Sequence, residues 1–211
     1  MGKNLGHLML DLETMGNKSG AALISVGAVE FDINTGETGK EFYERIDLQS
    51  SIDAGLIING STVYWWLQQN EKARMEVCKG GKDIAKVLFD LSEFIKSLGE
   101  FEIWGNGLRF DVGIIEDAYT ALGYHKMPWN FRKERDVRTL VSFAPEIKDN
   151  YPSIGTEHNP IDDCKHQIGY CYEIWKKMHS NGFTAKEVLN KLKEFGTLEE
   201  AMTWFNWEMM R

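Results

Sequence analysis

The chain has 211 residues, 43% of them hydrophobic, with a formal net charge of −8 and a pI of about 5.2. This length favours one well-packed domain with a small helical appendage over two full domains. The acidic balance argues against a protein that holds nucleic acid by broad neutralisation of phosphates. It is compatible with one that grips a chain end through metal ions, because metal-binding acids themselves make a protein acidic.

The three cysteines, Cys78, Cys164 and Cys171, are odd in number and show no CxxC spacing. We therefore expect neither a disulfide framework nor a zinc ribbon, and a reducing compartment fits. No stretch approaches the length of a membrane span, and the first apolar run is too short for a signal peptide. These features predict a soluble protein of the cytoplasm.

Two acids interrupt an apolar run near the start of the chain, Asp11 and Glu13, within the stretch from Gly6 to Gly16. The run has the period of two of a strand, so both carboxylates point to the same face. Like charges side by side disfavour each other's ionisation, and a divalent cation with oxygen ligands would offset that cost. Taken alone, however, Asp-x-Glu is more often a strand whose acids face water.

Two further strands join this first strand in an antiparallel meander of three, and two helices follow. Ser61 is the expected cap of the first helix, and an apolar stripe with a 3.6-residue period marks the second. That stripe is typical of core packing. In chain order, these elements are strands over residues 21–32 and 40–46 and helices over residues 61–69 and 83–98.

A strand over residues 101–104 leads through a glycine turn into a helix over residues 112–119. Asp111 lies at this junction, where functional groups gather in α/β architectures. The turn resembles a phosphate loop only loosely, because the chain has no GxxxxGK[ST] and no complete GxGxxG here. A first-turn acid that complements the helix dipole is the alternative explanation of Asp111.

A short strand and helix are expected over residues 135–141, and a loop over residues 148–156. The next helix runs to about Met178, and its start carries His158 and Asp163. If the intervening segment is helical, these two side chains are about one turn apart and project toward one site. A histidine before a helix is more often a cap or a surface group.

Residues 184–211 are expected to form two short amphipathic helices, and the last contains Trp204, Phe205 and Trp207. This aromatic tail suits packing against the domain or an oligomer interface. We therefore predict a main domain over residues 1–180 and a helical extension over residues 181–211.

Four acids thus arise at three strand or helix starts, and His158 stands five residues before the last of them. Jointly they meet the needs of a two-metal phosphodiesterase. Two divalent ions ~3.5–4 Å apart activate a water and stabilise the leaving 3′ oxygen, while a histidine accepts the proton of the water. The four acids are Asp11, Glu13, Asp111 and Asp163.

At these positions the chain resembles the DEDDh 3′–5′ exonucleases of the DnaQ-like superfamily over roughly residues 7–175. The third motif departs from the family's pattern, with Pro160 and Cys164 in place of the usual alanines, and Asp162 stands beside Asp163. Only the family's spacing from histidine to acid favours Asp163 as the ligand. The three motifs are Asp11-Leu12-Glu13-Thr14, Asn106 with Phe110-Asp111, and His158 through Cys164.

Within the superfamily, the chain is most similar to small phage and bacterial exonucleases related to phage exonuclease A and to a mycobacterial exoribonuclease. That likeness implies an α/β fold with a ribonuclease H-like mixed sheet, an antiparallel meander plus parallel strands, flanked by helices. It also implies a bacterial or phage-infected cell. The segments that carry it are residues 11–16, residues 61–69 with Trp65 and Trp66, and residues 104–107.

The resemblance implies a 3′–5′ exonuclease that releases nucleoside 5′-monophosphates from single-stranded 3′ ends or 3′ overhangs. It does not settle DNA against RNA, and we expect a slight preference for DNA. The four acids would hold two Mg²⁺ or Mn²⁺ ions, and His158 would be the base. A homodimer is left open. Three alternatives stand beside this expectation: an exoribonuclease of the same fold, a module that captures 3′ ends without turnover, and a hydrolase of mononucleotides or small phosphoesters.

An acidic protein needs stacking to hold a strand end, and a base on an aromatic face contributes ~1–3 kcal/mol. Trp65 and Trp66 point about 100° apart on a helix, so one is expected in the core, and Trp66 is chosen as the exposed one. The expected substrate-binding residues are Thr14, Met15, Trp66, Asn106 and Phe110.

Overall fold

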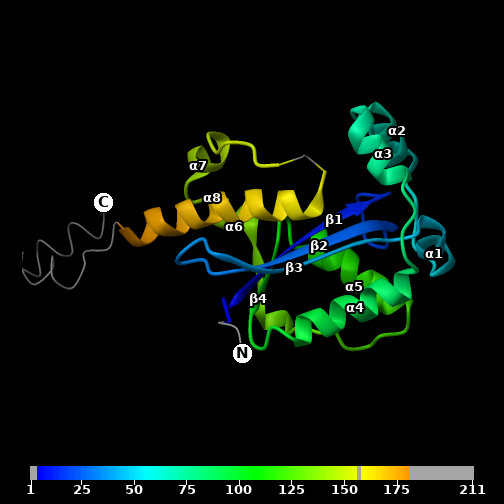
Figure 1. The fold of residues 1–211 in the computed structure, drawn as a ribbon, viewed down its shortest axis with the longest axis horizontal. Coiled ribbons are helices and arrows are strands. Elements are labelled where there is room, and N and C mark those ends of the chain that lie inside the picture. Colours follow the sequence, from blue (N-terminus) through cyan, green and yellow to red (C-terminus); the bar gives the residue numbers. More distant parts are fainter. Residues whose placement is uncertain (1–3, 156–157, 181–211) are drawn as a thin grey trace, which may run out of the picture. The chain divides into compact units, whose positions relative to one another are not determined.

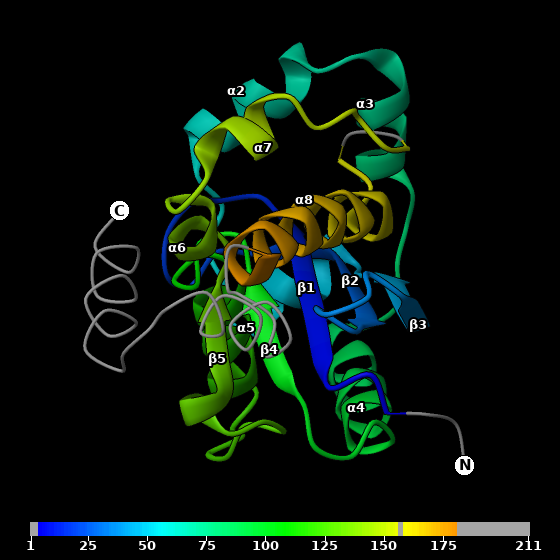
Figure 2. The ribbon, with the colours of Figure 1, turned by 90° about the vertical axis from the view of Figure 1, so that its left-hand side faces the viewer.

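The computed structural model describes residues 4–155 and 158–180. The chain divides into two compact units, Met1–Trp175 and Lys176–Arg211, and the first contains every element discussed below apart from the last turn of one helix. Five strands form one sheet in the order β3-β2-β1-β4-β5 (Figures 1 and 2). The strands are β1 (His7–Thr14), β2 (Leu23–Phe31), β3 (Thr38–Arg45), β4 (Glu102–Gly105) and β5 (Glu134–Asp136).

The sheet is mixed: β1, β2 and β3 pair antiparallel, whereas β4 is parallel to both β1 and β5. Helix α8 covers one face, and α4 and α5 cover the other (Figures 1 and 2). The helices are α1 (Leu48–Asp53), α2 (Gly60–Gln68), α3 (Glu71–Cys78), α4 (Ile84–Lys96), α5 (Asp111–Ala121), α6 (Val137–Val141), α7 (Pro145–Asp149) and α8 (Pro160–Ser180), with a 3₁₀ turn at Phe131–Lys133.

The alternation along β1 decides which side of the sheet carries the acids. Leu8, Leu10 and Leu12 belong to the core that α4 and α5 close. Met9 belongs to the second core, beneath α8. Because successive side chains of a strand point to opposite faces, Asp11 and Glu13 continue the row of Met9 and lie on the side of α8.

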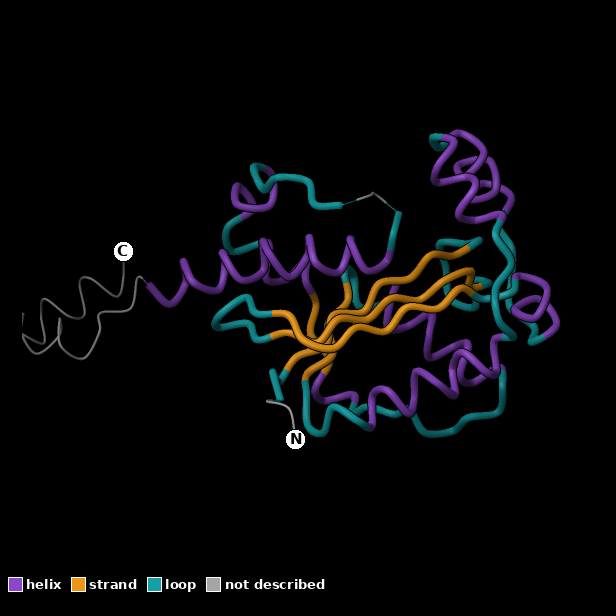
Figure 3. Tube along the Cα trace, in the orientation of Figure 1, coloured by secondary structure: helices purple, strands orange, loops and turns teal. Residues whose placement is uncertain are grey.

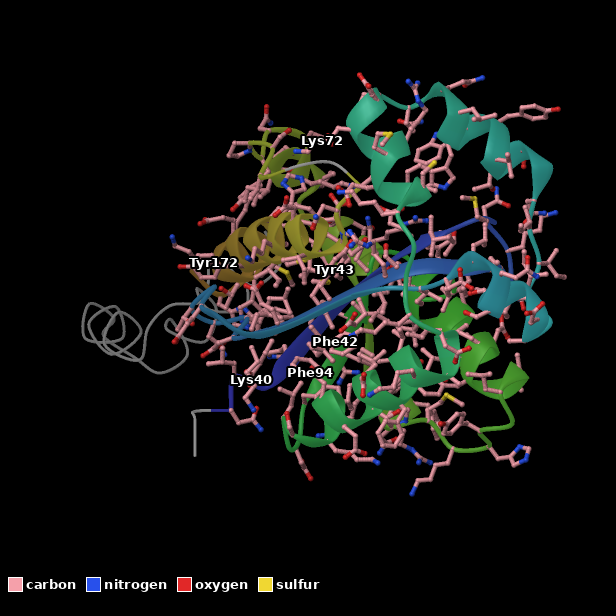
Figure 4. All side chains as sticks on the ribbon, turned by 45° about the vertical axis from the view of Figure 1, so that its right-hand side comes forward. Lys40, Phe42, Tyr43, Lys72, Phe94 and Tyr172 are labelled. Carbon is pink, nitrogen blue, oxygen red and sulfur yellow. The ribbon has the colours of Figure 1, made fainter. Side chains whose placement is uncertain are left out.

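The meander predicted for the start of the chain is confirmed, as Figure 3 shows in the ladder of strands between helices. The predicted helix at 83–98 is α4, which Asp83 caps by accepting hydrogen bonds from two backbone N–H groups of its first turn. This helix packs against β3, where the ring of Phe42 on the strand lies 5.5 Å from that of Phe94 on the helix (Figure 4). The short strand and helix expected at 135–141 are β5 and α6.

Two predictions about the helices are corrected. Ser61 does not cap α2, because the helix begins at Gly60 and Asn59 is its N-cap residue. Helix α3 was not expected, since its sequence is mostly polar and Ala73 is its only buried residue. The sequence indicates this helix by its N-cap residue and not by an apolar stripe. The Asn70 side chain accepts a hydrogen bond from the backbone N–H of Ala73.

No helix in the described ranges is long and apolar enough to cross a membrane. The helices predicted over 184–211 lie outside the described residues, so the predicted extension at 181–211 stays a prediction.

Candidate active site

The first two acids lie under the start of α8. Asp11 pairs with Gly27 of β2, and a Cβ atom at Gly27 would lie 2.5 Å from the Cβ of Pro160. Glycine at this position therefore lets the first residue of α8 approach the sheet beside Asp11. Proline suits the first position of a helix, so the departure from the family's alanine is accommodated here. One helical turn after Asp163, the Gln167 side chain donates a hydrogen bond of 2.9 Å to Asp11 Oδ1.

The third acid, Asp111, opens α5 at the end of β4 and is 2% exposed. Its Oδ2 accepts a 2.8 Å hydrogen bond from the backbone N–H of Asn106, and the backbone of Leu12 on β1 supplies another. A Cβ at Gly105 would lie 3.1 Å from the Cβ of Asp111, so the strand end leaves just enough room for this side chain. These contacts hold Asp111 beside β1.

The start of α8 supplies the last two groups, His158 and Asp163. Asn159 caps the helix, since its Oδ1 accepts from the backbone N–H of Ile161 at 3.1 Å. His158 precedes this cap with φ +64°, the only non-glycine residue with positive φ in the described chain. Such a backbone conformation costs free energy and is often found at functional sites.

Two of the four acids and the histidine converge on one point. Ligand atoms of Glu13, His158 and Asp163 all lie within 4.8 Å of one another, and His158 Nδ1 is 4.0 Å from Glu13 Oε1. The neighbouring Asp162 points elsewhere, because a Cβ at Gly155 would come within 2.6 Å of its carboxyl group and Cβ. The geometry thus places Asp163, rather than Asp162, in the cluster, as the spacing predicted.

Burial and mutual repulsion raise the pKa values of these acids. The pKa of Asp11 is raised well above its usual value by burial first and then by Asp111, Glu13 and Asp163. Burial, Asp163 and Asp111 raise the pKa of Glu13 to about 8. Burial raises that of Asp111 to about 7, although its backbone hydrogen bonds and the charge of Arg138 lower it. Such a set of crowded oxygen donors fits a hard divalent cation, whose charge would offset the repulsion.

The expected exposure of the tryptophan pair is wrong. Trp66 is 4% exposed and donates its indole N–H to the Thr14 carbonyl at 2.9 Å, whereas Trp65 is 42% exposed. Both rings meet the imidazole of His158 edge-on, with centroids 5.0 Å away for Trp65 and 5.6 Å for Trp66. Trp66 therefore ties α2 to the end of β1, and Trp65 offers the open aromatic face.

The other expected substrate-binding residues have different environments. Thr14 and Met15 are 5% and 8% exposed, so their side chains offer a substrate little surface. Phe110 is half-buried against the core. Asn106 differs from these, because its Oδ1 is buried without a hydrogen-bond partner among the described residues. A buried amide oxygen without a partner can accept a hydrogen bond from a bound ligand.

The sequence comparisons agree with this arrangement. The model of the family described as the 3′-5′ exoribonuclease Rv2179c-like domain matches residues 6–175. The chain belongs to this family. The exodeoxyribonuclease of Enterobacteria phage T4 is 26% identical over 166 residues, which cover 67% of this chain and 73% of the phage protein. The predicted enzyme class, a 3′–5′ exonuclease, is confirmed.

Solved structures share the fold at low identity. The nuclease domain of 3′hExo, a DEDDh family member bound to rAMP, has a TM-score of 0.55 and 13% identity and covers 81% of this chain and 91% of its own. Exonuclease I of E. coli in complex with a dA16 oligonucleotide has a TM-score of 0.58 and 13% identity over 88% of this chain. The chain described here covers only 45% of the length of exonuclease I. The predicted ribonuclease H-like fold is confirmed.

One polar residue beside the acids was missed by sequence reasoning. Gln167 bonds Asp11, yet it lies outside all three motifs. Its signal was available: residues four apart share a helix face, so Gln167 follows Asp163 toward the same site.

The raised pKa values predict how the stability of this exonuclease depends on pH without metal. Carboxyl groups of the unfolded chain titrate near pH 4, whereas Glu13 and Asp111 titrate at about 8 and about 7 in the fold. The folded state therefore holds more protons, and the contribution of these groups is fully present below about pH 4 and is lost as pH rises to about 8. The melting temperature in EDTA should fall over this range, and Mg²⁺ should restore it most at the alkaline end.

Asp11→Asn is the matched test of that slope, because it removes one charge from the cluster with little change of shape. Its melting temperature in EDTA should fall less steeply with pH than that of the unaltered protein. Equal slopes in thermal unfolding scans of the two proteins would contradict the raised pKa values.

Proposed function

We propose that this chain is a metal-dependent exonuclease that hydrolyses phosphodiester bonds at single-stranded 3′ ends, or at 3′ overhangs, and releases nucleoside 5′-monophosphates. The observation that carries this proposal is the convergence of Glu13, His158 and Asp163 within 4.8 Å, beside the half-buried Asp11 and the buried Asp111. Family membership supports the class of reaction, and the cluster supports its chemistry.

The four acids Asp11, Glu13, Asp111 and Asp163 would hold two divalent ions, Mg²⁺ or Mn²⁺. When bound, such ions lower the pKa of a water and stabilise negative charge on the attacking and leaving oxygens. The donor set supports this assignment, since carboxylate oxygens are the ligands that these ions prefer.

The protein's own part is to orient these acids and to move one proton. Gln167 fixes the carboxylate of Asp11, and the Asn106 backbone N–H fixes that of Asp111. The imidazole of His158 stands between Glu13 and the ring of Trp65, on a backbone held at positive φ by the capped helix behind it. In this position it would accept the proton of the attacking water, a task that suits histidine near neutral pH.

The sugar preference rests on weaker support. The phage T4 relative is named an exodeoxyribonuclease, whereas the family is described as an exoribonuclease domain. We keep a slight preference for DNA as the proposal and an exoribonuclease as the alternative. Rates on a DNA and an RNA oligonucleotide of the same sequence would decide between them.

A labelling assay tests the proposed function as a whole. With Mg²⁺ or Mn²⁺, a 3′-labelled oligonucleotide should release its label as a mononucleotide at once, and a 5′-labelled one should shorten step by step. Excess EDTA should stop both. Binding of the 3′ end without cleavage would indicate a capture module, and turnover of p-nitrophenyl thymidine monophosphate alone would indicate a hydrolase of small phosphoesters.

The two tryptophans should respond differently to removal. Trp65→Ala should raise KM for a single-stranded end by roughly 5- to 150-fold, the equivalent of ~1–3 kcal/mol for one stacked base, with little change in melting temperature. Trp66→Ala should instead destabilise the fold by ~3–5 kcal/mol, because it empties a buried site. Thermal unfolding and steady-state kinetics of both variants separate these effects. An unchanged KM in Trp65→Ala would make this residue purely structural.

A cytoplasmic location and a homodimer also stay proposals. All three cysteines are free, which supports a reducing compartment. Sedimentation analysis of the purified chain would establish its oligomeric state.

A further inference from the structure

A groove of about 850 Å³ lies next to the acid cluster and has no role in the mechanism above. Its walls come from the connection after β1, from α5 and the loop that precedes it, and from the junction of β5 and α6. Phe110 lines it, and the next residue in the chain is Asp111, so the groove and the catalytic acids are neighbours. Its volume is within the range of small-molecule sites, ~300–1,000 Å³.

Three basic residues line this groove, Lys18, Arg109 and Arg138. All three are exposed, and within the described part of the chain none of them forms an ion pair. The guanidinium of Arg138 lies over Gly107, where a Cβ would come within 2.9 Å of its Cζ. In a chain with a net charge of −8, three unpaired cations around one groove need an explanation.

Acids also line the groove, but two of them are occupied by donors of the protein. Asp117 Oδ2 accepts from the Ser19 hydroxyl and from a backbone N–H, both at 2.8 Å. Asp136 Oδ2 accepts from the backbone N–H of Leu108 at 2.7 Å, and its Oδ1 caps α6. A third acid, Glu116, is only half-exposed. The acids thus hold the walls together, while the exposed charged groups of the groove are cations.

We propose that this groove binds the sugar–phosphate backbone of the strand on the 5′ side of the scissile bond, with Lys18, Arg109 and Arg138 contacting its phosphates. The inference rests on the proposed function, because the strand is the substrate of the acid cluster. Contacts to phosphate carry no sequence information and serve DNA and RNA alike. Substrates of several nucleotides would gain from the groove, whereas a dinucleotide would not.

The test compares an octanucleotide with a dinucleotide that has the same two 3′ residues. The double variant Lys18→Gln, Arg109→Gln should lower the ratio of kcat/KM for the long substrate to that for the short one by roughly tenfold, because two charge-assisted hydrogen bonds are lost. The dependence of log KM on log salt should also flatten by about one for each lost contact. Arg138 stays unchanged in this variant, since its charge also reaches Asp111.

Lys86→Gln is the matched control, because Lys86 is exposed, lies on α4 outside the groove and pairs with Asp90. This variant should keep both the ratio and the salt dependence. The proposal is overturned if the double variant loses activity equally on both substrates or on neither. It is also overturned if Trp65→Ala, but not the double variant, abolishes the advantage of the octanucleotide, because the strand would then run over α2.

Failure of the proposed function gives a different result, namely that the unaltered protein cleaves neither substrate. Binding of a 5′-fluorescein octanucleotide, followed by anisotropy, then decides on the groove by itself. Weaker binding by the double variant than by Lys86→Gln supports the groove without catalysis. Equal affinities of the two variants overturn it.

Discussion

Asp11→Asn should reduce cleavage of a 3′-labelled oligonucleotide by ~10²–10³-fold or more while leaving the fold intact, the usual effect of losing one electrostatic element of an active site. Asp11 lies half-buried on the central strand, and the charges of the three other acids act on it. The amide keeps the size of the carboxylate but removes its charge, so the variant should bind the metal ions more weakly. Calorimetric titration with Mn²⁺ and a timed cleavage assay measure the two effects.

The same substitution should raise the melting temperature in EDTA, because it removes one of the charges that repel each other. For a protein of this size, each kcal/mol of relieved repulsion corresponds to about 2–4 °C. Asp162→Asn is the control, since the Asp162 carboxyl lies against Gly155 outside the cluster, and this variant should retain activity. Wild-type rates in Asp11→Asn, or full activity of the unaltered protein in excess EDTA, would refute the metal-dependent mechanism.

His158→Ala should still bind metal and 3′ ends, because no carboxylate is lost, yet turn over ~10²–10⁴-fold more slowly, the usual contribution of a positioned base. Because a base must be unprotonated to accept a proton, the rate of the unaltered protein should rise with pH, and the variant should lose this dependence. Single-turnover rates across pH, with anisotropy to measure strand affinity, separate this loss from weaker binding.

His158→Gln refines the test, since glutamine keeps hydrogen-bonding capacity and cannot act as a general base near neutral pH. It should be as slow as the alanine variant. His125→Ala, at an exposed loop position, should behave as the unaltered protein. A near-normal kcat in either His158 variant would reduce this residue to a helix-entry group and favour another proton acceptor.

Much of the site could be predicted from the sequence, because the patterns that indicate it are local. The period of β1 places Asp11 and Glu13 on one face, and Asp163 lies in the first turn of α8, close to His158 just before the helix. The positive φ of His158 could not be read in this way, since it depends on the helix cap and the aromatic rings around it.

The prediction of which tryptophan is exposed was wrong for a related reason. Neighbouring positions on a short helix differ by a rotation, and the predicted N-cap of α2, Ser61, lies two residues after the observed one, Asn59. A tertiary contact decides which tryptophan is buried. The carbonyl of Thr14 accepts a hydrogen bond from the indole N–H of Trp66, and Trp65 stays exposed. Helix α3 and Gln167 were missed because neither belongs to an apolar stripe or a motif.

The contact between Gly27 and Pro160 bears on how inactive relatives would be recognised. Any side chain at Gly27 would collide with the first residue of α8 and force that helix away from β2. His158 and Asp163 would move with it, although Gly27 itself supplies no chemical group. A descendant with alanine there could carry all five motif residues and be catalytically silent. Surveys that infer activity from the motifs alone would misclassify it, so the residue opposite Asp11 belongs in the pattern that is searched.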